Sequence, residues 1–148
     1  MLLQKESNPS LNTVTGYGDN YLEINREKYQ TAVYFSPEGP INTLEISSIN
    51  EINLDLLHSL IGIESNQDDP MAFLDGEPDI TLPEDAPEVI LVGTGKDQYF
   101  LPVKITQPLL SMGIGIESMT THAAARTYNI LMSEERRVIV LLLPGEAH

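Results

Sequence analysis

The last third of this chain constrains its fold more than any other segment. A short, β-branched apolar run ends at a glycine turn, a helical pattern follows two threonines, and a longer apolar run closes the segment. These stretches are residues 88–92, 93–95, 123–132 and 138–143. Alternating strands and helices predict a layered α/β sheet, whose loops at one edge are able to form a site.

The first half of the chain is predicted to be mostly β. Short apolar stretches between glycine, proline and polar turns are typical of strands, and they occupy residues 11–15, 21–24, 31–35 and 44–46. A short helix is predicted over residues 53–61, with Asn53 as its N-cap and Gly62 as its stop. A loose N-terminus over residues 1–10 and an exposed acidic loop over residues 64–87 are also expected.

The length of 148 residues and the apolar fraction of 41% predict a single domain over residues 1–148. No apolar run approaches the roughly 20 residues that cross a bilayer, so membrane insertion is not expected. The N-terminus lacks a signal-peptide core, which makes the cytoplasm the simplest expected location. Cysteine is absent, and this excludes disulfides, thiol catalysis and thiolate metal sites.

Negative charge dominates the chain, whose formal net charge is −14. Thirteen acidic residues and no Lys or Arg lie between Lys28 and Lys96. Because nucleic-acid binders need a basic footprint against phosphates, nucleic-acid binding is rejected. Anionic membrane surfaces are excluded by the same argument. A basic protein partner stays open beside the simpler role of acidity in solubility.

The Gly93–Gly95 turn matches neither nucleotide-binding motif. A dinucleotide fingerprint requires glycine where Gln98 stands, and a P-loop requires Ser or Thr where Asp97 stands. A glycine turn at a strand end serves either a tight bend or the approach of a ligand to the backbone. If the helix start near Thr121 lies at the same edge, a small anion fits between the two. The alternative is a purely structural role, in which Thr120 or Thr121 only caps the helix.

The predicted helix has a polar and an apolar side. The polar stripe consists of His122, Arg126, Asn129 and Ser133. It is either a solvated face or a recognition surface, in which Arg126 clamps a carboxylate or phosphate. The other side consists mainly of Ala124, Thr127, Tyr128 and Leu131 and is predicted to pack on the sheet. Tyr128 is expected in the core with its hydroxyl satisfied.

No metal site, cofactor or catalytic residue is predicted. The histidines at positions 58, 122 and 148 are scattered, and prolines interrupt the acidic cluster over residues 68–79. The sequence contains no GxSxG elbow for a nucleophile. Nothing nominates a carboxylate pair among twenty-two acidic residues, so enzymatic activity is unsupported.

Three motifs in order resemble a known family. They are Gly93-Thr94-Gly95 after an apolar strand, residues 113–117, and residues 117–131 followed by 134–138. Over about residues 12–143, they resemble the domain shared by mitochondrial complex I assembly factor 3 and uncharacterised bacterial and archaeal proteins. The resemblance implies a three-layer α/β domain with a central mixed sheet, helices on one face and a smaller β layer on the other.

The resemblance also nominates ligand-binding residues, although it supplies no established reaction. With the turn, these are Gly93, Thr94, Gly95, Glu117, Met119, Thr121, Arg126, Thr127, Tyr128 and Asn129. Two positions depart from the family pattern, because Ala125 stands where many relatives have cysteine and Thr120 where an acidic residue is common.

Two functions follow from the resemblance and the residues. The first is a non-enzymatic protein-interaction or assembly domain that serves a multi-subunit complex. The alternative is a small-molecule (anion) binding domain, or an enzyme of unknown reaction, that uses the Gly93–Gly95 turn and the helix start near Thr121. The sequence leaves the oligomeric state open.

Overall fold

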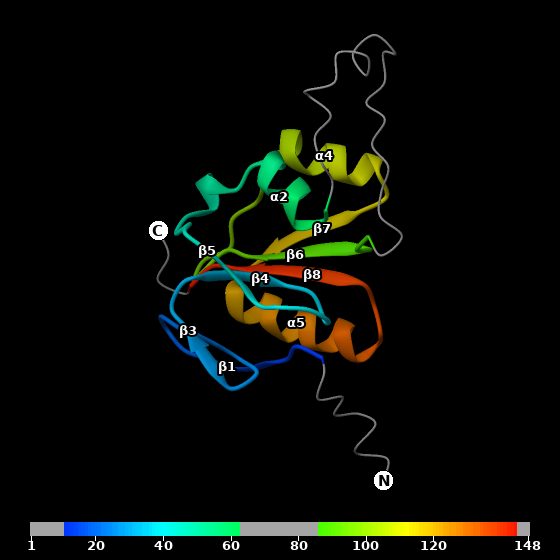
Figure 1. Cartoon of the computed structure of the whole chain (residues 1–148). Helices are drawn as coiled ribbons and strands as arrows, with labels where there is room; N and C mark the ends of the chain where they lie inside the picture. Colours follow the sequence, from blue (N-terminus) through cyan, green and yellow to red (C-terminus); the bar gives the residue numbers. More distant parts are fainter. Residues whose placement is uncertain (1–10, 63–85, 145–148) are drawn as a thin grey trace.

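Two sheets of unequal size organise the protein. The computed structural model describes residues 11–62 and 86–144. The small sheet has the strand order β1-β2-β3, and the central sheet has the order β5-β4-β8-β6-β7 (Figure 1). The strands are β1 (Val14–Tyr17), β2 (Leu22–Ile24), β3 (Glu27–Tyr29), β4 (Ala32–Phe35), β5 (Asn42–Leu44), β6 (Val89–Gly93), β7 (Gly115–Met119) and β8 (Val138–Leu142). The helices are η1 (Ile49–Glu51), α2 (Leu54–Leu60), α4 (Val103–Ser111) and α5 (Thr121–Ser133).

The central sheet is mixed. Strand β6 pairs in parallel with β7 and β8, whereas β4 pairs antiparallel with β8 and β5. The chain leaves β6 through α4 to reach β7, and leaves β7 through α5 to reach β8. These are the two crossover connections that the pattern over residues 88–143 predicts. The predicted class, a mixed α/β fold with a central sheet and a smaller β layer, is confirmed.

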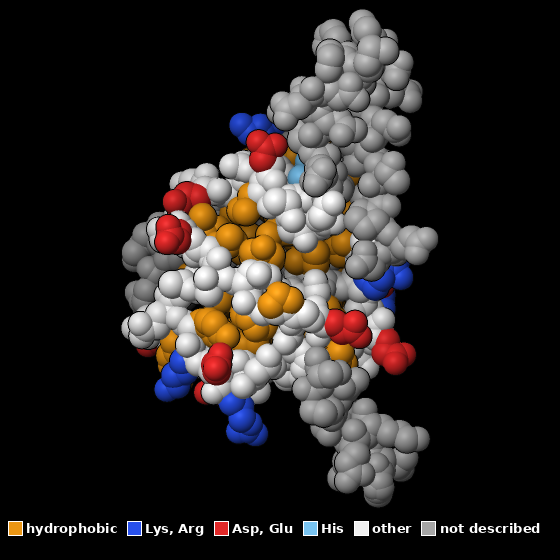
Figure 2. Space-filling view, viewed as in Figure 1, with side chains coloured by type: hydrophobic (Ala, Val, Ile, Leu, Met, Phe, Trp, Pro, Cys, Tyr) orange, Lys and Arg blue, Asp and Glu red, His pale blue; other side chains and the backbone are white. Residues whose placement is uncertain are grey.

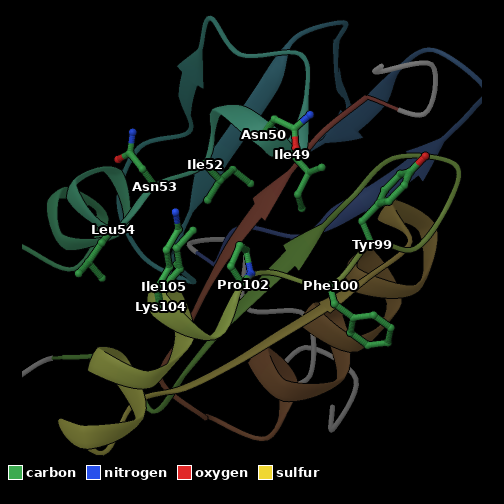
Figure 3. Close-up of a pocket in the computed structure, with 10 residues that line it drawn as sticks. All are labelled: Ile49, Asn50, Ile52, Asn53, Leu54, Tyr99, Phe100, Pro102, Lys104 and Ile105. Atoms are coloured by element: carbon green, nitrogen blue, oxygen red, sulfur yellow. The ribbon is translucent and has the colours of Figure 1, made fainter.

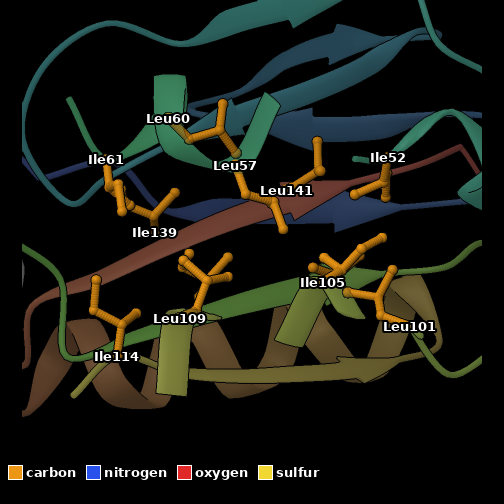
Figure 4. Packing of buried hydrophobic residues seen from close by; sticks show 12 residues of the cluster. Ile52, Leu57, Leu60, Ile61, Leu101, Ile105, Leu109, Ile114, Ile139 and Leu141 are labelled. Carbon is orange, nitrogen blue, oxygen red and sulfur yellow. The ribbon is translucent and has the colours of Figure 1, made fainter. Parts of the chain in front are cut away.

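Two apolar clusters cover the two faces of the central sheet. On one face, α2 and α4 pack on β6 and β8 through side chains such as Leu57, Leu109 and Leu141, which are fully buried (Figure 4). On the other face, α5 and the small sheet pack together on β4, β6 and β8, with Tyr128 edge-on to Phe35 at 5.0 Å between ring centroids. The expectation of helices on one face only is therefore corrected, because α5 shares the face of the small β layer.

The predicted helix after Asn53 is confirmed. The Asn53 side chain accepts a hydrogen bond of 2.8 Å from the Leu56 amide, as an N-cap does. Gly62 follows the helix with a φ of +79°, a left-handed conformation that glycine adopts without strain. Leu57 and Leu60 are the buried side chains of α2, so the helix contributes to the core.

Two strand predictions in the first half need correction. Residues 27–29 form strand β3, where no strand was predicted, because Asn25 and Arg26 make a two-residue hairpin turn with φ of 53° and 69°. The strand predicted over residues 44–46 lies at Asn42–Leu44. Neither range was predictable from the pattern, since a polar strand of three residues gives no apolar alternation.

Several sequence predictions fall on parts of the chain that lie outside the described residues. They are the N-terminus over residues 1–10, most of the acidic loop over residues 64–87, and His148. The single domain over residues 1–148 stays a prediction for the same reason.

The hairpin turn gives a test of this fold. Replacing Arg26→Gly is expected to raise the free energy of unfolding by about 0.5–1 kcal/mol, because a side chain in the left-handed region costs energy that glycine avoids. The matched change Asn25→Gly is expected to lower it, since Asn25 accepts from the Thr13 amide at 3.0 Å and donates to Asn12 at 2.8 Å. Urea unfolding measures both, and equal responses of the two variants would contradict this account.

Candidate functional site

The glycine turn after β6 lies against the first turn of α5. A Cβ atom added at Gly93 would lie 2.8 Å from the Thr121 Cα and 2.9 Å from a methyl group of Leu142. Gly95 has a φ of +95°, which favours glycine. The two glycines therefore allow a close approach and a tight bend, and the predicted juxtaposition of turn and helix start is what the structure shows.

Thr121 joins three segments through one buried hydroxyl group. Its Oγ1 accepts a hydrogen bond of 2.8 Å from the Gly95 amide and donates one of 2.6 Å to the Leu143 carbonyl. Its own amide donates to the Gly95 carbonyl at 2.9 Å. The side chain that caps α5 is Thr120, whose Oγ1 accepts from the Ala123 amide at 3.3 Å. Thr121 thus ties β6 and β8 to the helix start.

Thr94 closes the turn on its other side. This residue is buried, and its hydroxyl oxygen lies 2.6 Å from the Asp97 carbonyl and 3.1 Å from the Met119 carbonyl. The same oxygen accepts from the Tyr99 amide at 3.3 Å, and the Thr94 amide donates to the Met119 carbonyl at 2.8 Å. The loops at the carboxyl ends of β6 and β7 are thereby tied to one another.

The ends of β6 and β7 form a switch point in the sheet, where ligands of open α/β folds often bind. The chain leaves β6 toward the face that holds α4, and leaves β7 toward the face that holds α5. However, the amides of Thr94, Gly95 and Thr121 already donate to protein atoms. An anion bound here would lack those donors. Ligand binding by the turn stays a prediction that the geometry does not favour.

The polar stripe of α5 faces the small sheet. The Asn129 side-chain oxygen Oδ1 accepts from the Val14 backbone amide at 3.0 Å, and its Nδ2 donates to the Val14 backbone carbonyl at 2.9 Å. The His122 ring stacks on Tyr17 with 4.0 Å between centroids, and Arg126 donates to the Tyr17 hydroxyl at 3.3 Å. His122 and Asn129 of the stripe therefore belong to a contact between α5 and the small sheet, which neither sequence interpretation included, whereas Arg126 is exposed. The remaining member of the stripe, Ser133, is exposed and donates to the Ile130 carbonyl.

The other nominated residues are spread around β7 and α5. Glu117 is exposed on β7, whereas the Met119 sulfur lies 3.6 Å from the Thr127 hydroxyl in a half-buried contact. Tyr128 is fully buried and donates a hydrogen bond of 2.7 Å to the Asn12 carbonyl. The prediction that Tyr128 lies in the core with its hydroxyl satisfied is confirmed.

A hollow lies near the start of β8, and charged residues form part of its lining. It has a volume of about 640 Å³ and includes Pro87, Arg136 and Arg137 in its lining. The Glu88 carboxylate accepts a hydrogen bond of 3.0 Å from the Arg137 backbone amide and one of 3.2 Å from the Arg136 guanidinium. Both contacts lower the pKa of Glu88. The Glu88 carboxylate is therefore hydrogen-bonded to both arginines within the protein.

Most of the large exposed apolar side chains lie on α4 and in the loop that precedes it. Five large apolar side chains of the described residues are exposed, namely Tyr99, Phe100, Val103, Leu110 and Ile130. Four of them fall within residues 99–110, in the loop after β6 and on the outer side of α4. We call these four the α4 patch. Monomeric proteins rarely expose clustered apolar groups without a use for them.

A groove borders the α4 patch. Its volume is about 520 Å³, and it is lined by η1, the start of α2 and the loop that enters α4. Figure 3 shows Ile52, Pro102 and Ile105 in its interior and Tyr99 and Phe100 on one flank. Phe100 is the most exposed of these residues, with 83% of its surface accessible. This surface was not predicted from the sequence, because an apolar residue of a helix is interpreted as a core residue whichever way its side chain points.

The surface around the α4 patch differs in charge from the rest of the chain. No Asp or Glu lies between Asp97 and Glu117, and Lys104 is the one charged residue of that stretch. Figure 2 shows a different face, over the strands of the central sheet, where apolar side chains gather toward the middle and most charged side chains lie around them. The α4 patch is thus both apolar and free of the acidity that marks the chain as a whole.

A family model described as "Protein of unknown function (DUF498/DUF598)" matches residues 14–143. The chain belongs to the DUF498/DUF598 family. The matched range runs from the start of β1 to the residue after β8, so it spans both sheets. Family membership therefore covers the glycine turn, α5 and the α4 patch together.

Solved structures of bacterial proteins share this DUF498/DUF598 fold. A Bordetella parapertussis protein is 44% identical with a TM-score of 0.73, over 91% of this chain and 97% of that one. A Bordetella pertussis protein described as a Mth938-like domain is 49% identical with a TM-score of 0.73, over 92% and 87%. These relatives fit the bacterial side of the resemblance, while the link to the mitochondrial assembly factor stays a prediction.

One relative carries a membrane-related name. The "13 kDa major membrane protein" of Francisella tularensis subsp. holarctica is 29% identical over 125 residues, which are 82% of this chain and 99% of that protein. In the part of this chain that the structure describes, none of the helices has the length and apolar character needed to cross a bilayer. The cytoplasmic location stays a prediction.

Gly93 provides a test of the close contact at the turn. Gly93→Ala is expected to lower the free energy of unfolding by about 1–3 kcal/mol, because the new methyl group would overlap backbone atoms of Thr121. Gly115→Ala is the matched control, since its added Cβ would meet no atom closer than 3.7 Å. Urea unfolding compares the two. Equal stability of both variants would show that the turn is not packed against α5 in this way.

Tyr128 provides a test that depends on pH. Burial raises the pKa of its hydroxyl above the ordinary value of 10.0. Above about pH 10 an exposed tyrosine of the unfolded chain ionises while the buried one does not, so the native stability should fall as pH rises. Tyr128→Phe is expected to remove this part of the alkaline loss and to cost about 1–3 kcal/mol at neutral pH, since the Asn12 carbonyl loses its donor. An alkaline loss that is identical in both proteins would contradict the assignment.

Proposed function

We propose that the protein is a non-enzymatic interaction domain that helps to assemble a multi-subunit complex, and that the α4 patch binds its partner. The observation that carries this proposal is the concentration of exposed apolar side chains over residues 99–110. Large apolar groups such as Phe100, which exposes 83% of its surface, commonly mark protein–protein contacts. The adjoining groove of about 520 Å³ would accept a side chain of the partner.

The organisation of α4 supports a contact surface. Val103, Gln107 and Leu110 follow the spacing of one helix face and are exposed. Ile105 and Leu109 lie on the opposite face and are buried against the sheet. The helix is therefore apolar on two sides, one of which packs within the protein. The outer side retains apolar residues that the fold itself does not use.

The absence of acidic residues between Asp97 and Glu117 supports the same surface. Interface centres are depleted in charged residues relative to the remaining surface. In a chain with a net charge of −14, a stretch that carries only Lys104 is the part best suited to close contact. The resemblance to the mitochondrial assembly factor makes assembly of a multi-subunit complex the specific form of the proposal.

The alternative function receives less support. It places a small anion or a substrate between the Gly93–Gly95 turn and the start of α5. There, the Gly95 amide and the Thr121 hydroxyl bond to each other at 2.8 Å, and Thr121 is buried. The Arg126 guanidinium lies 3.3 Å from the Tyr17 hydroxyl on the small sheet. The candidate ligand groups thus have partners within the protein.

Affinity capture tests the proposal. The native chain, used as bait in cells that make it, is expected to retain a reproducible partner that the double variant Val103→Glu/Leu110→Glu loses. The matched control is Ile130→Glu, because Ile130 is 57% exposed on α5 while Leu110 is 51% exposed on α4. The double variant places two negative charges at exposed helical positions, and the control places one. Only the double variant places its charges in the α4 patch.

The control also guards against loss of folding. Circular dichroism and thermal unfolding should be similar in the two variants, since all three side chains are exposed. A partner that the double variant retains as well as the native chain would contradict the role of the α4 patch. Repeated recovery of no partner would contradict the proposed function.

A further inference from the structure

Strand β7 is an edge of the central sheet, and some of its backbone groups have no partner among the described residues. It is the last strand in the order β5-β4-β8-β6-β7, and it pairs with β6 on one side only among the described residues. An open edge of this kind is a template for adding another strand. The α4 patch lies beside it, because α4 packs against β7 and leads directly into it.

The hydrogen bonds of β7 show which groups point away from the sheet. The Gly115 amide donates to the Glu88 carbonyl and the Met119 carbonyl accepts from the Thr94 amide, so both point toward β6. Because successive residues of a strand address opposite neighbours, the polar backbone groups of Ile116 and Ser118 point outward. The Ile114 carbonyl also points outward, since it lies opposite the Gly115 amide in the same peptide.

Two groups on this edge already have partners. The Ser118 carbonyl accepts a hydrogen bond of 3.1 Å from the Gln98 side chain. The Ile114 amide donates one of 3.0 Å to the Leu109 carbonyl. Within residues 11–62 and 86–144, the outward groups without a partner are the amide and carbonyl of Ile116, the amide of Ser118 and the carbonyl of Ile114.

This pattern fits a second copy of the same strand. If two β7 strands pair antiparallel about a two-fold axis at Ile116, the two Ile116 residues exchange both of their hydrogen bonds. The Ser118 amide of each copy then meets the Ile114 carbonyl of the other. The one bond that this register omits would join the Ile114 amide to the Ser118 carbonyl, and these are the two groups that are already engaged.

The side chains of this register are compatible with pairing. Glu117 stands opposite Gly115 of the other copy, which has no side chain, so no acidic residue directly faces another. A two-fold axis normal to the sheet keeps α4 of both copies on the same face, beside the joined edges. The stretch between Asp97 and Glu117 holds no acidic residue, which reduces the repulsion between two chains of net charge −14.

We infer that the protein forms a two-fold symmetric dimer through the edges of β7, with the α4 patches packed beside the joined sheet. The inference rests on the proposed function, because it names the partner of the α4 patch as a second copy of the chain. A strand from a different protein is the competing occupant, and it lacks the self-complementary set of donors and acceptors described above.

Sedimentation equilibrium of the full chain tests the dimer. Over about three decades of concentration, the mass should rise from 16.4 kDa toward twice that value. Leu110→Glu should weaken the association at least about tenfold, and Ile130→Glu should leave it unchanged. Higher salt should strengthen the association, because it screens the repulsion of two acidic chains. Glu117→Gln should strengthen it too, since the two Glu117 residues are diagonal neighbours in the proposed register.

A single introduced cysteine tests the register, since the chain has none of its own. Residues that exchange both bonds have Cα atoms about 5.5 Å apart, which is within reach of a disulfide. Ile116→Cys should therefore form a cross-linked dimer under oxidation, whereas Ile130→Cys should not. A mass that stays at 16.4 kDa at all concentrations and salt levels would overturn the inference. So would a dimer that Ile116→Cys does not trap.

The outcomes separate the two proposals. If the chain is monomeric and Val103→Glu/Leu110→Glu still abolishes capture of a different protein, the dimer is wrong and the proposed function stands. If the dimer forms as described and no other partner depends on the α4 patch, the inference stands and the assembly role fails. If the variants change neither association nor capture, both are wrong.

Discussion

The structure depends on the contact between the glycine turn after β6 and the first turn of α5. Gly93 lacks a side chain where a Cβ would lie 2.8 Å from the Thr121 backbone, and the buried Thr121 hydroxyl bonds to the Gly95 amide and the Leu143 carbonyl. A larger residue at Gly93 would move α5 away from the sheet. A residue without the hydroxyl at Thr121 would leave two buried backbone groups unpaired, at a cost of about 1–3 kcal/mol for each.

Beyond its first turn, α5 packs against the small sheet and forms hydrogen bonds with it. The Asn129 side chain forms two hydrogen bonds with the Val14 backbone, as a neighbouring strand would. The Tyr128 hydroxyl donates a hydrogen bond to the Asn12 carbonyl. The packing of Phe35 against Tyr128 joins both layers to the central sheet. Several residues that the family resemblance nominates for a ligand, namely Thr121, Tyr128 and Asn129, thus form the joint between α5, the central sheet and the small sheet.

The sequence was sufficient for features that depend on local chemistry. The Asn53 cap, the Gly62 stop and the crossovers between β6, β7 and β8 follow from capping residues, glycine positions and apolar periodicity, which act over a few residues. The partners of the polar stripe were not predictable in this way. A periodic pattern shows that His122, Arg126 and Asn129 share a face, but a small sheet more than a hundred residues away decides what that face contacts.

The α4 patch was missed for a related reason. Val103 and Leu110 have the same hydrophobicity as Ile105 and Leu109, and only the packing of α4 on the sheet separates the exposed pair from the buried pair. The absence of acidic residues between Asp97 and Glu117 was visible in the sequence. It gains meaning once the structure shows that four exposed apolar side chains lie in this stretch, which leads into the edge strand β7.

The glycine turn is an internal contact between β6 and α5, and the β7 edge is a surface able to pair with another strand. Amide hydrogen exchange, resolved by residue in dilute native chain, tests both statements in one experiment. The amides of Gly95 and Thr121 should exchange slowly at every concentration, while those of Ile116 and Ser118 should exchange rapidly in dilute solution and slow as the concentration rises. Fast exchange at Gly95 and Thr121, with Ile116 and Ser118 unaffected by concentration, would contradict the account.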